Sequence, residues 1–327
     1  MKKRMITGLK PTGPLTLGSW LGAIKPLIRY KEDYEILTFV ADLHALTIRP
    51  GAEDLRENVV DLEATLIAAG LAEGDSKVFL QSALPAHSQL EWLLTCETDL
   101  PDLMKMPQYK NYKQRHCDKA VPAGMLMYPS LMNADILLYD ADFVPVGADQ
   151  KPHVDLTRDV AIAFNKSRGE TFKVPEAIVP EAGAKVMSLS DPTKKMSKSE
   201  SDKGTVYLHD DFNTVLSKFM KAKTDSEGKI YYDPERKPGI SNLLSIYAAV
   251  KGISIKEAET VFRDETDYGA FKRAVAAAVI EDLTWLIKKR PFELREINRF
   301  IDAGNAAAAE IASKTLDRAY RAVGLRR

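Results

Sequence analysis

An apolar run at residues 34–41, with the sequence YEILTFVA, constrains the fold of this chain more than any other segment. A strand that is apolar at almost every position is buried on both faces, which is typical of a parallel sheet covered by helices. Residues 4–7, 77–81 and 143–146 carry shorter runs of the same kind, and residues 53–69 have helical spacing. This alternation of strands with helices predicts a parallel sheet with crossover helices.

The second part of the chain has a different pattern. Apolar residues recur near every 3.6 positions in most segments beyond residue 205, which predicts helices. These segments are residues 211–223, 241–250, 254–262, 268–289 and 292–323. The sequence therefore predicts a nucleotide-binding type of α/β domain over residues 1–205 and an all-helical domain over residues 206–327. A further possibility from the sequence is that the last helix packs back on the first domain.

Composition excludes several classes of protein. Among the 327 residues, 45% are hydrophobic and 28% are charged, so the chain can bury a core and is not a disordered polyelectrolyte. Its two cysteines, Cys96 and Cys117, are too few for a disulfide framework or a four-thiolate zinc site. No apolar run approaches the roughly 18 residues that span a bilayer. The basic residues 1–4 precede a strand-length segment rather than a signal-peptide core. We therefore expect a soluble cytoplasmic protein.

The charges of the chain balance, with 46 Lys and Arg residues against 46 Asp and Glu residues. Proteins that bind nucleic acid usually carry a basic excess, so the balance by itself argues against such a partner. Binding depends, however, on where the charges are placed. Basic residues gather in residues 105–119, 194–198 and 288–327, and acidic residues in residues 53–75. A basic RNA-binding face on a protein of zero net charge is compatible with this distribution.

A turn rich in glycine and proline follows the first predicted strand, with the sequence TGLKPTGPLTLGSW at residues 7–20. Gly8 and Gly13 permit close approach of a ligand to the backbone, and Thr16 can cap the helix that begins near Leu17. The free amides and the dipole of a helix N-terminus suit a phosphate group. The spacing matches neither a dinucleotide fingerprint nor a Walker A loop. An ordinary strand-to-helix turn is the alternative interpretation.

A second segment, KKMSKS at residues 194–199, places lysines on both sides of a serine. Such a loop can close over a polyphosphate and stabilise the charge that develops on it. The alternative is a solvated basic loop.

Residues 195–199, KMSKS, are identical to one signature of the class I aminoacyl-tRNA synthetases. The partner signature of that class, the HIGH motif, follows the first strand, and TLGS at residues 16–19 occupies its place here. The resemblance narrows along the chain to the bacterial tryptophanyl-tRNA synthetases. It rests on YPSLMNADILLY at residues 128–139, VPVGADQ at residues 144–150, DLHALT at residues 42–47 and KPGISNLL at residues 237–244. The resemblance implies a Rossmann-like catalytic domain that carries a helical amino-acid-binding insert, followed by a helical anticodon-binding domain.

The resemblance also implies a tryptophan pocket. Asp135 would accept a hydrogen bond from the indole N–H, and Met132, Val144 and Val146 would wall the ring. A site built around a substrate N–H rejects analogues that lack it. Without the resemblance, Asp135 could be a helix aspartate paired with a backbone or arginine donor, and the three apolar residues could be plain core. Further tryptophan-binding residues implied are Gln150, Gln108, His44, Tyr128 and Gly8.

The implied ATP-binding residues lie mainly around the two signatures. They are Lys10, Gly18, Ser19, Gly147, Asp149, Val186, Lys195, Met196, Ser197, Lys198 and Lys113. The implied catalytic residues are Lys195, Lys198, Thr16 and Ser19. No protein ligand to a metal is expected, because Mg²⁺ would be carried by ATP. Three alternatives stay open, namely a structural role for His44, N-capping of the next helix by Asp149 or Gln150, and a solvated helix face around Lys113.

Two features depart from the family pattern, the HIGH motif and residue 10. Thr16 and Ser19 replace both histidines of the HIGH motif; threonine is common at the first position in the tryptophan branch, whereas asparagine or histidine is more frequent at the second. Lys10 stands where bacterial members commonly have glutamine. The added charge of Lys10 leads to the hypothesis of an altered affinity for substrates or an altered sensitivity to inhibitors.

The function implied is that of a tryptophan–tRNA ligase, which activates L-tryptophan with ATP and transfers it to tRNA(Trp). The resemblance further implies a cytoplasmic homodimer that binds neither membrane nor DNA. Two alternatives remain. A tyrosine-specific synthetase shares the fold and both signatures, but its binding helix typically carries Gln and a Tyr-Asp pair where this chain has Met132 and Ala134-Asp135. A non-catalytic RNA-binding paralogue is the other, suggested only by Ser19.

Overall fold

The computed structural model describes residues 2–115, 120–147, 150–178, 185–197, 203–291 and 293–326. By their contacts, the residues form two compact units. We call Met1–Thr12, Tyr30–Pro180 and Pro291–Arg327 the sheet unit, and Gly13–Arg29 with Glu181–Arg290 the helical unit. In the described part of the chain, no helix has both the length and the apolar character needed to cross a membrane.

A five-stranded parallel sheet forms the centre of the sheet unit. Its strands are β1 (Lys3–Leu9), β2 (Tyr34–Val40), β3 (Lys77–Leu80), β4 (Phe143–Pro145) and β5 (Glu176–Ile178), in the order β3-β2-β1-β4-β5. The last five residues of β2 are all buried, as the apolar run predicted. Pro145 is the final residue of β4, where its missing N–H interrupts no further pairing. The α/β fold with a parallel sheet is therefore confirmed.

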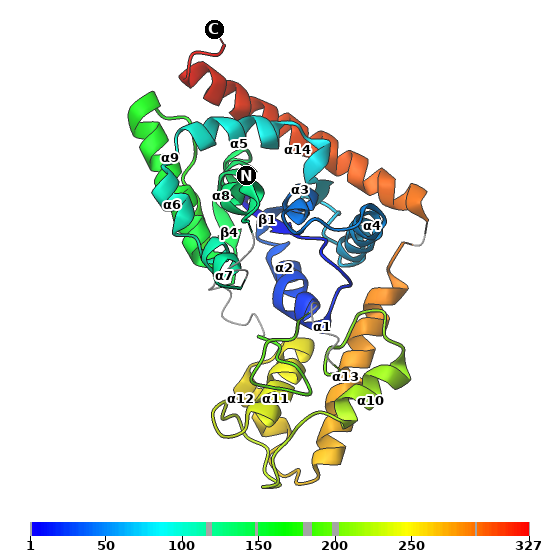
Figure 1. Ribbon diagram of the computed structural model, residues 1–327. Coiled ribbons are helices and arrows are strands. Elements are labelled where there is room, and N and C mark those ends of the chain that lie inside the picture. Colours follow the sequence, from blue (N-terminus) through cyan, green and yellow to red (C-terminus); the bar gives the residue numbers. More distant parts are fainter. Residues whose placement is uncertain are drawn as a thin grey trace. The chain divides into compact units, whose positions relative to one another are not determined.

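Helices cover the sheet and lie on either side of it (Figure 1). Those of the sheet unit are α3 (Asp42–Ala45), α4 (Ala52–Ala68), α5 (Ala86–Cys96), α6 (Leu100–Met104), α7 (Pro107–Arg115), α8 (Ala123–Leu137), α9 (Lys151–Arg168) and α14 (Leu294–Ala322). Short 3₁₀ turns, η2 (Leu46–Ile48) and η3 (Gln81–Ala83), follow α3 and β3. One continuous apolar core joins strands β2 and β3 to helices α5, α8, α9 and α14.

Helix α14 closes the outer edge of the sheet, along β3 (Figure 1). The amide Oδ1 of Asn305 accepts a hydrogen bond from Leu80 N at 3.0 Å. Gly304 lies so close to β3 that a Cβ there would stand 1.8 Å from the carbonyl oxygen of Val78. The last helix thus protects an edge strand that would otherwise offer open backbone groups.

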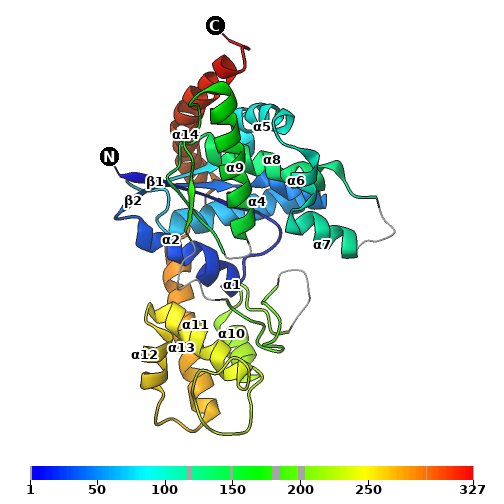
Figure 2. The same cartoon turned by 90° about the vertical axis from the view of Figure 1, so that its left-hand side faces the viewer.

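The helical unit contains α1 (Leu17–Ser19), the π-turn η1 (Trp20–Ile24), α2 (Lys25–Tyr30, apart from Tyr30 itself), α10 (Phe212–Met220), α11 (Pro238–Lys251), α12 (Ile255–Val261) and α13 (Tyr268–Lys288). Figure 2 shows α11 and α13 side by side. Asp282 of α13 accepts hydrogen bonds from Trp20 Nε1 at 2.7 Å and from Lys25 Nζ at 2.5 Å. Residues 13–29 are therefore tied to the C-terminal helices.

This division differs from the boundary predicted near residue 205. Residues 13–29 and the described part of 181–204 join the helical unit, and α14 joins the sheet unit. The catalytic and anticodon-binding roles of the two predicted domains stay predictions.

Candidate functional site

Polar side chains gather at the carboxyl ends of the strands in the sheet unit. His44 follows β2 on α3, and Gln81 opens η3 directly after β3. Asp135 lies on α8, ahead of β4, and Gln150 stands after β4, just before α9. Since β1 has β2 on one side and β4 on the other, the strand order reverses here, and such switch points are where open α/β sheets bind ligands.

Asp135 is the centre of this cluster and is fully buried. Its Oδ1 accepts hydrogen bonds from Gln81 Nε2 at 2.8 Å and pairs with His87 Nδ1 at 2.7 Å. Its Oδ2 accepts from the same Gln81 nitrogen at 2.9 Å and pairs with His44 Nε2 at 2.8 Å. Three side chains from three segments therefore hold one carboxyl group.

These partners keep Asp135 ionised. Burial raises the pKa of this carboxyl, but the hydrogen bonds and charges of His44 and His87 lower it by more, and the resulting pKa is about 2. A buried carboxylate is costly without donors. Here the donors are present, so the group is a permanent acceptor at neutral pH.

His87 connects Asp135 to Tyr139. His87 Nε2 lies 2.7 Å from the Tyr139 hydroxyl, and both residues are fully buried. Burial, and then the charge of Asp135, raises the pKa of Tyr139 well above its ordinary value, so the phenol keeps its proton. The phenol can then donate to Nε2 while Nδ1–H donates to Asp135. The rings of Phe39 and Phe79 flank the imidazole.

A second polar group lines the same part of the unit. The Tyr128 hydroxyl contacts Gln108 Oε1 and lies 2.5 Å from His153 Nε2. Gln108 Nε2 donates to Gln150 Oε1 at 3.4 Å. The ring of His44 meets the ring of Tyr128 edge-on, with centroids 6.4 Å apart. The structure thus brings together the predicted residues His44, Gln108, Tyr128 and Gln150.

The three residues predicted to form the apolar wall belong to the core of the sheet unit or pack against it. Val144 belongs to the core cluster, and Met132 and Val146 are partly buried against it. Gly8, by contrast, owes its missing side chain to packing, since a Cβ there would stand 2.3 Å from the Phe39 ring. A role of these residues in binding tryptophan stays a prediction.

The two signature segments meet within the helical unit. Thr16 caps α1, with its Oγ1 accepting from Ser19 N at 3.2 Å, as predicted. Gly18 faces the other signature, because a Cβ there would lie 3.6 Å from Met196 Cβ and 3.7 Å from Val186 Cβ. Met196 N donates to Val186 O at 3.0 Å. The side chain of Lys195 is exposed.

The remaining predicted residues fall into two groups. The structure places Lys10, Lys113 and Gly147 at exposed positions and Ser197 at a half-buried one. Lys198 and Asp149 lie outside the described residues, and so does the side chain of Arg115.

Sequence reasoning missed Gln81, His87 and Tyr139. Gln81 was included in the predicted strand 77–81, whereas β3 ends at Leu80 and the polar side chain stands directly after it. Nothing in the local sequence marks His87 or Tyr139, which meet Asp135 only through the packing of α5 against α8.

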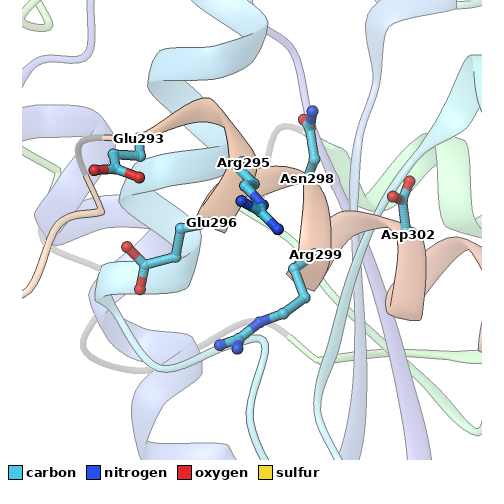
Figure 3. A pocket seen from close by; sticks show the side chains of 6 residues that line it. All are labelled: Glu293, Arg295, Glu296, Asn298, Arg299 and Asp302. Atoms are coloured by element: carbon cyan, nitrogen blue, oxygen red, sulfur yellow. The ribbon is translucent and has the colours of Figure 1, made fainter.

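A hollow on the sheet unit follows the first turns of α14, and Figure 3 shows the side chains that line it. They are Glu293, Arg295, Glu296, Asn298, Arg299 and Asp302. None belongs to the predicted site. Their acidic and basic groups offset each other along a single helix, and we assign no ligand to them.

Comparison with known proteins agrees with this arrangement. The sequence profile of a family described as tRNA synthetases class I (W and Y) matches residues 2–284. The chain is 42% identical over 330 residues to a tryptophan–tRNA ligase of Halalkalibacterium halodurans, covering 100% of this chain and 99% of that protein. A tryptophanyl-tRNA synthetase structure from Mycoplasma pneumoniae matches with a TM-score of 0.90 at 34% identity, covering 100% of this chain and 99% of the other. A tryptophanyl-tRNA synthetase of Campylobacter jejuni complexed with ADP and tryptophan matches with a TM-score of 0.79 at 28% identity, covering 98% and 99%.

Proposed function

Because the chain belongs to the class I tRNA synthetases of the tryptophan and tyrosine type, we propose that it acts as a tryptophan–tRNA ligase. The observation that carries the proposal is the ionised carboxylate of Asp135, buried among donors at the switch point of the sheet. An indole N–H can only donate, so a group that only accepts is its natural partner.

Specificity for tryptophan rather than tyrosine is assigned to the neighbours of Asp135, because an ionised carboxylate accepts from an indole N–H and from a phenol O–H alike. The tyrosine branch typically has Gln and Tyr at the positions of Met132 and Ala134, where this chain offers no polar side chain. Met132 precedes Asp135 by nearly one turn of α8, is partly buried, and is apolar, which suits a ring face. The ammonium and carboxylate of the amino acid are assigned to Gln150, Gln108 and Tyr128.

The first step of the proposed reaction needs no general base. The tryptophan carboxylate attacks the α-phosphorus of ATP, the bond to the β-phosphate breaks, and pyrophosphate leaves. Catalysis is then positioning and stabilisation of phosphate charge. We assign these roles to the cap of α1, with Thr16 and Ser19, and to the lysines Lys195 and Lys198. Mg²⁺ enters bound to the triphosphate, since phosphate oxygens are ligands that it prefers.

In the second step a ribose hydroxyl at the 3′ end of tRNA(Trp) attacks the carbonyl of the adenylate and releases AMP. Basic residues would meet the tRNA backbone. The end of α14 is a weaker candidate for this than the sequence suggested, because its cations are engaged. Arg318 pairs with Asp140 at 2.6 Å, and Arg321 and Arg326 pair with Asp317 at 2.8 and 3.1 Å. Our candidates for the contacts are the exposed Lys110 and Lys113 on α7.

The proposal includes a homodimer in the cytoplasm, where tRNA is charged. Large apolar side chains are exposed on the sheet unit, among them Trp92 at 68%, Ile48 at 58% and Leu46 at 54%. Exposed aromatic and aliphatic side chains of this size are typical of protein interfaces. Sedimentation velocity of the wild type, compared with Trp92→Glu, tests the dimer.

Amino-acid-dependent ATP–pyrophosphate exchange tests the proposed function. We expect exchange with tryptophan and none above background with tyrosine. Exchange with tyrosine alone would assign the chain to the tyrosine branch. Exchange with neither amino acid would favour the alternative of a non-catalytic RNA-binding paralogue.

A further inference from the structure

Both oxygens of Asp135 are fully used in this structure. Each accepts from Gln81 Nε2 and pairs with one histidine, at distances between 2.7 and 2.9 Å. A carboxylate offers about four lone-pair positions. An additional donor, such as an indole N–H, therefore reaches Asp135 only if one of the present donors leaves.

Gln81 is fixed at both ends of its amide. Its Nε2 contacts both carboxylate oxygens, and its Oε1 accepts from Leu43 N at 3.1 Å and from His44 N at 3.4 Å. The residue has no exposed surface. Its departure would leave buried backbone and side-chain groups unpaired, which costs about 1–3 kcal/mol for each group.

His87 is fixed as well. Both ring nitrogens have buried partners, Nδ1 with Asp135 and Nε2 with Tyr139. Aromatic rings surround the imidazole, with centroids of Phe79 at 6.1 Å and Tyr139 at 5.6 Å. Rotation of this side chain would displace close-packed core atoms.

His44 is the donor that can leave. Its side chain retains 10% of its surface, whereas that of His87 has none. Its main chain is held independently of its ring, because Gln81 Oε1 accepts from its N–H and the Thr47 hydroxyl donates to its carbonyl at 2.8 Å. The ring also faces Tyr128, on the side where the amino-acid ligands are assigned. A change of rotamer can therefore free Oδ2 without moving the backbone.

We propose that tryptophan binds by displacing the His44 imidazole from Oδ2 of Asp135, so that His44 acts as a proton-sensitive competitor of the indole N–H. The inference rests on the proposed function. Protonated His44 is held to the carboxylate as a charge-assisted pair, about twice as strong as a neutral hydrogen bond, and is therefore harder to displace. Acid should thus weaken tryptophan binding while leaving Asp135 ionised.

Other titratable groups near Asp135 define the controls. They are His87 on α5, Tyr139 after α8 and Glu91 on α5, whose pKa is raised by burial and to a lesser extent by the charge of Asp135. Only His44 is expected to change partners on binding. Replacement of His44 alone should therefore remove the pH dependence.

The test measures tryptophan binding by calorimetry between pH 5.5 and 8, for the wild type and for His44→Gln. Glutamine keeps an N–H donor for Asp135 but does not titrate. For the wild type we expect the dissociation constant to rise as the pH falls, by up to about tenfold per pH unit, the limit for one linked proton, and protons to be released on binding at acidic pH. For His44→Gln we expect a flat profile and no proton release.

A tryptophan isostere with sulfur in place of the indole N–H provides a control that needs no variant. It shares the ammonium and carboxylate of tryptophan but cannot displace His44 from the carboxylate, so its binding to the wild type should be independent of pH. An equal pH slope for the isostere, or a slope that persists in His44→Gln, would overturn the inference and leave the proposed function intact. Wild-type protein that binds no tryptophan at any pH would overturn the proposed function itself.

Discussion

Glu63 is a buried carboxyl group whose protonation affects stability. It lies on α4 with 5% of its surface exposed. Burial, followed by the charge of Asp42, raises its pKa to about 7. An acid whose pKa is higher in the folded state stabilises the fold fully below its unfolded pKa, and this contribution is lost as pH rises through the folded pKa.

The chain should therefore lose stability between about pH 4.5 and pH 7, on the order of 3 kcal/mol for this group. Glu63→Gln should remove that loss and raise the urea midpoint at pH 8, while Glu57→Gln, at an exposed position of the same helix, should not. Urea unfolding at pH 5 and pH 8 measures the difference. Equal shifts in both variants would show that Glu63 is not the group responsible.

The prediction for catalysis concerns Lys195. Its side chain is exposed beside the segment that packs on Gly18, so its removal should leave the fold unchanged. Lys195→Ala should lower tryptophan-dependent ATP–pyrophosphate exchange more than tenfold and retain tryptophan binding, because the lysine acts on phosphate charge. Lys194→Ala, which removes a neighbouring lysine paired with Asp191, is the matched control. A parallel loss of tryptophan binding would contradict the assignment of this loop.

Asp135 shows how far single residues could be predicted. A lone acid on an apolar helix requires a donor, but that requirement also fits an ordinary paired aspartate, and only the family resemblance implied a role in the site. The donors themselves, His44, Gln81 and His87, are separated from it by 91, 54 and 48 positions. Only tertiary packing brings them together, so the sequence could suggest His44 through a family pattern and could not suggest His87.

At the scale of elements, β1 to β4 could be predicted because each contains a short apolar run with clear ends, whereas β5 has no such run and was not predicted. Helix boundaries were harder where proline intervenes. The helix predicted over residues 241–250 begins earlier, at Pro238, because the first turn of a helix needs no N–H donor. The helix expected from Leu17 is interrupted by a π-turn that ends at Ile24, two residues before Pro26, which cannot donate within a regular helix.

The close contact between helix α14 and strand β3 can be tested by substitution of a glycine. Gly304→Ala should destabilise the sheet unit by several kcal/mol, because the new Cβ would overlap the Val78 carbonyl oxygen and force α14 away from β3. Gly124→Ala is the control, since a Cβ at that helical position meets no atom within 4 Å. It should be neutral or stabilise by up to about 1 kcal/mol. Thermal unfolding compares the two, and similar melting temperatures would contradict the close contact between α14 and β3.

For the whole molecule, neither the domain division nor the charge could be predicted from local pattern. The boundary near residue 205 followed the change from alternating to helical segments. In the structure, residues 13–29 belong to the helical unit and α14 belongs to the sheet unit. Contacts between residues that are distant in sequence link each of these segments to its unit. The zero net charge likewise hides local differences. Several basic residues of α14 are paired with acids, and a basic run, residues 288–290, lies at the C-terminal end of α13.

Charging of tRNA tests the central claim most directly. The chain should attach labelled tryptophan to tRNA(Trp) in the presence of ATP and Mg²⁺, with activity that falls steeply as salt rises, because phosphate contacts release counterions. Asp135→Asn, which preserves shape but adds a donor where an acceptor is needed, should lower kcat/KM for tryptophan by two orders of magnitude or more, in line with roughly 10⁴-fold rejection at sites built around one substrate hydrogen bond. Charging with tyrosine, or tryptophan charging that is unaffected by Asp135→Asn, would contradict the account.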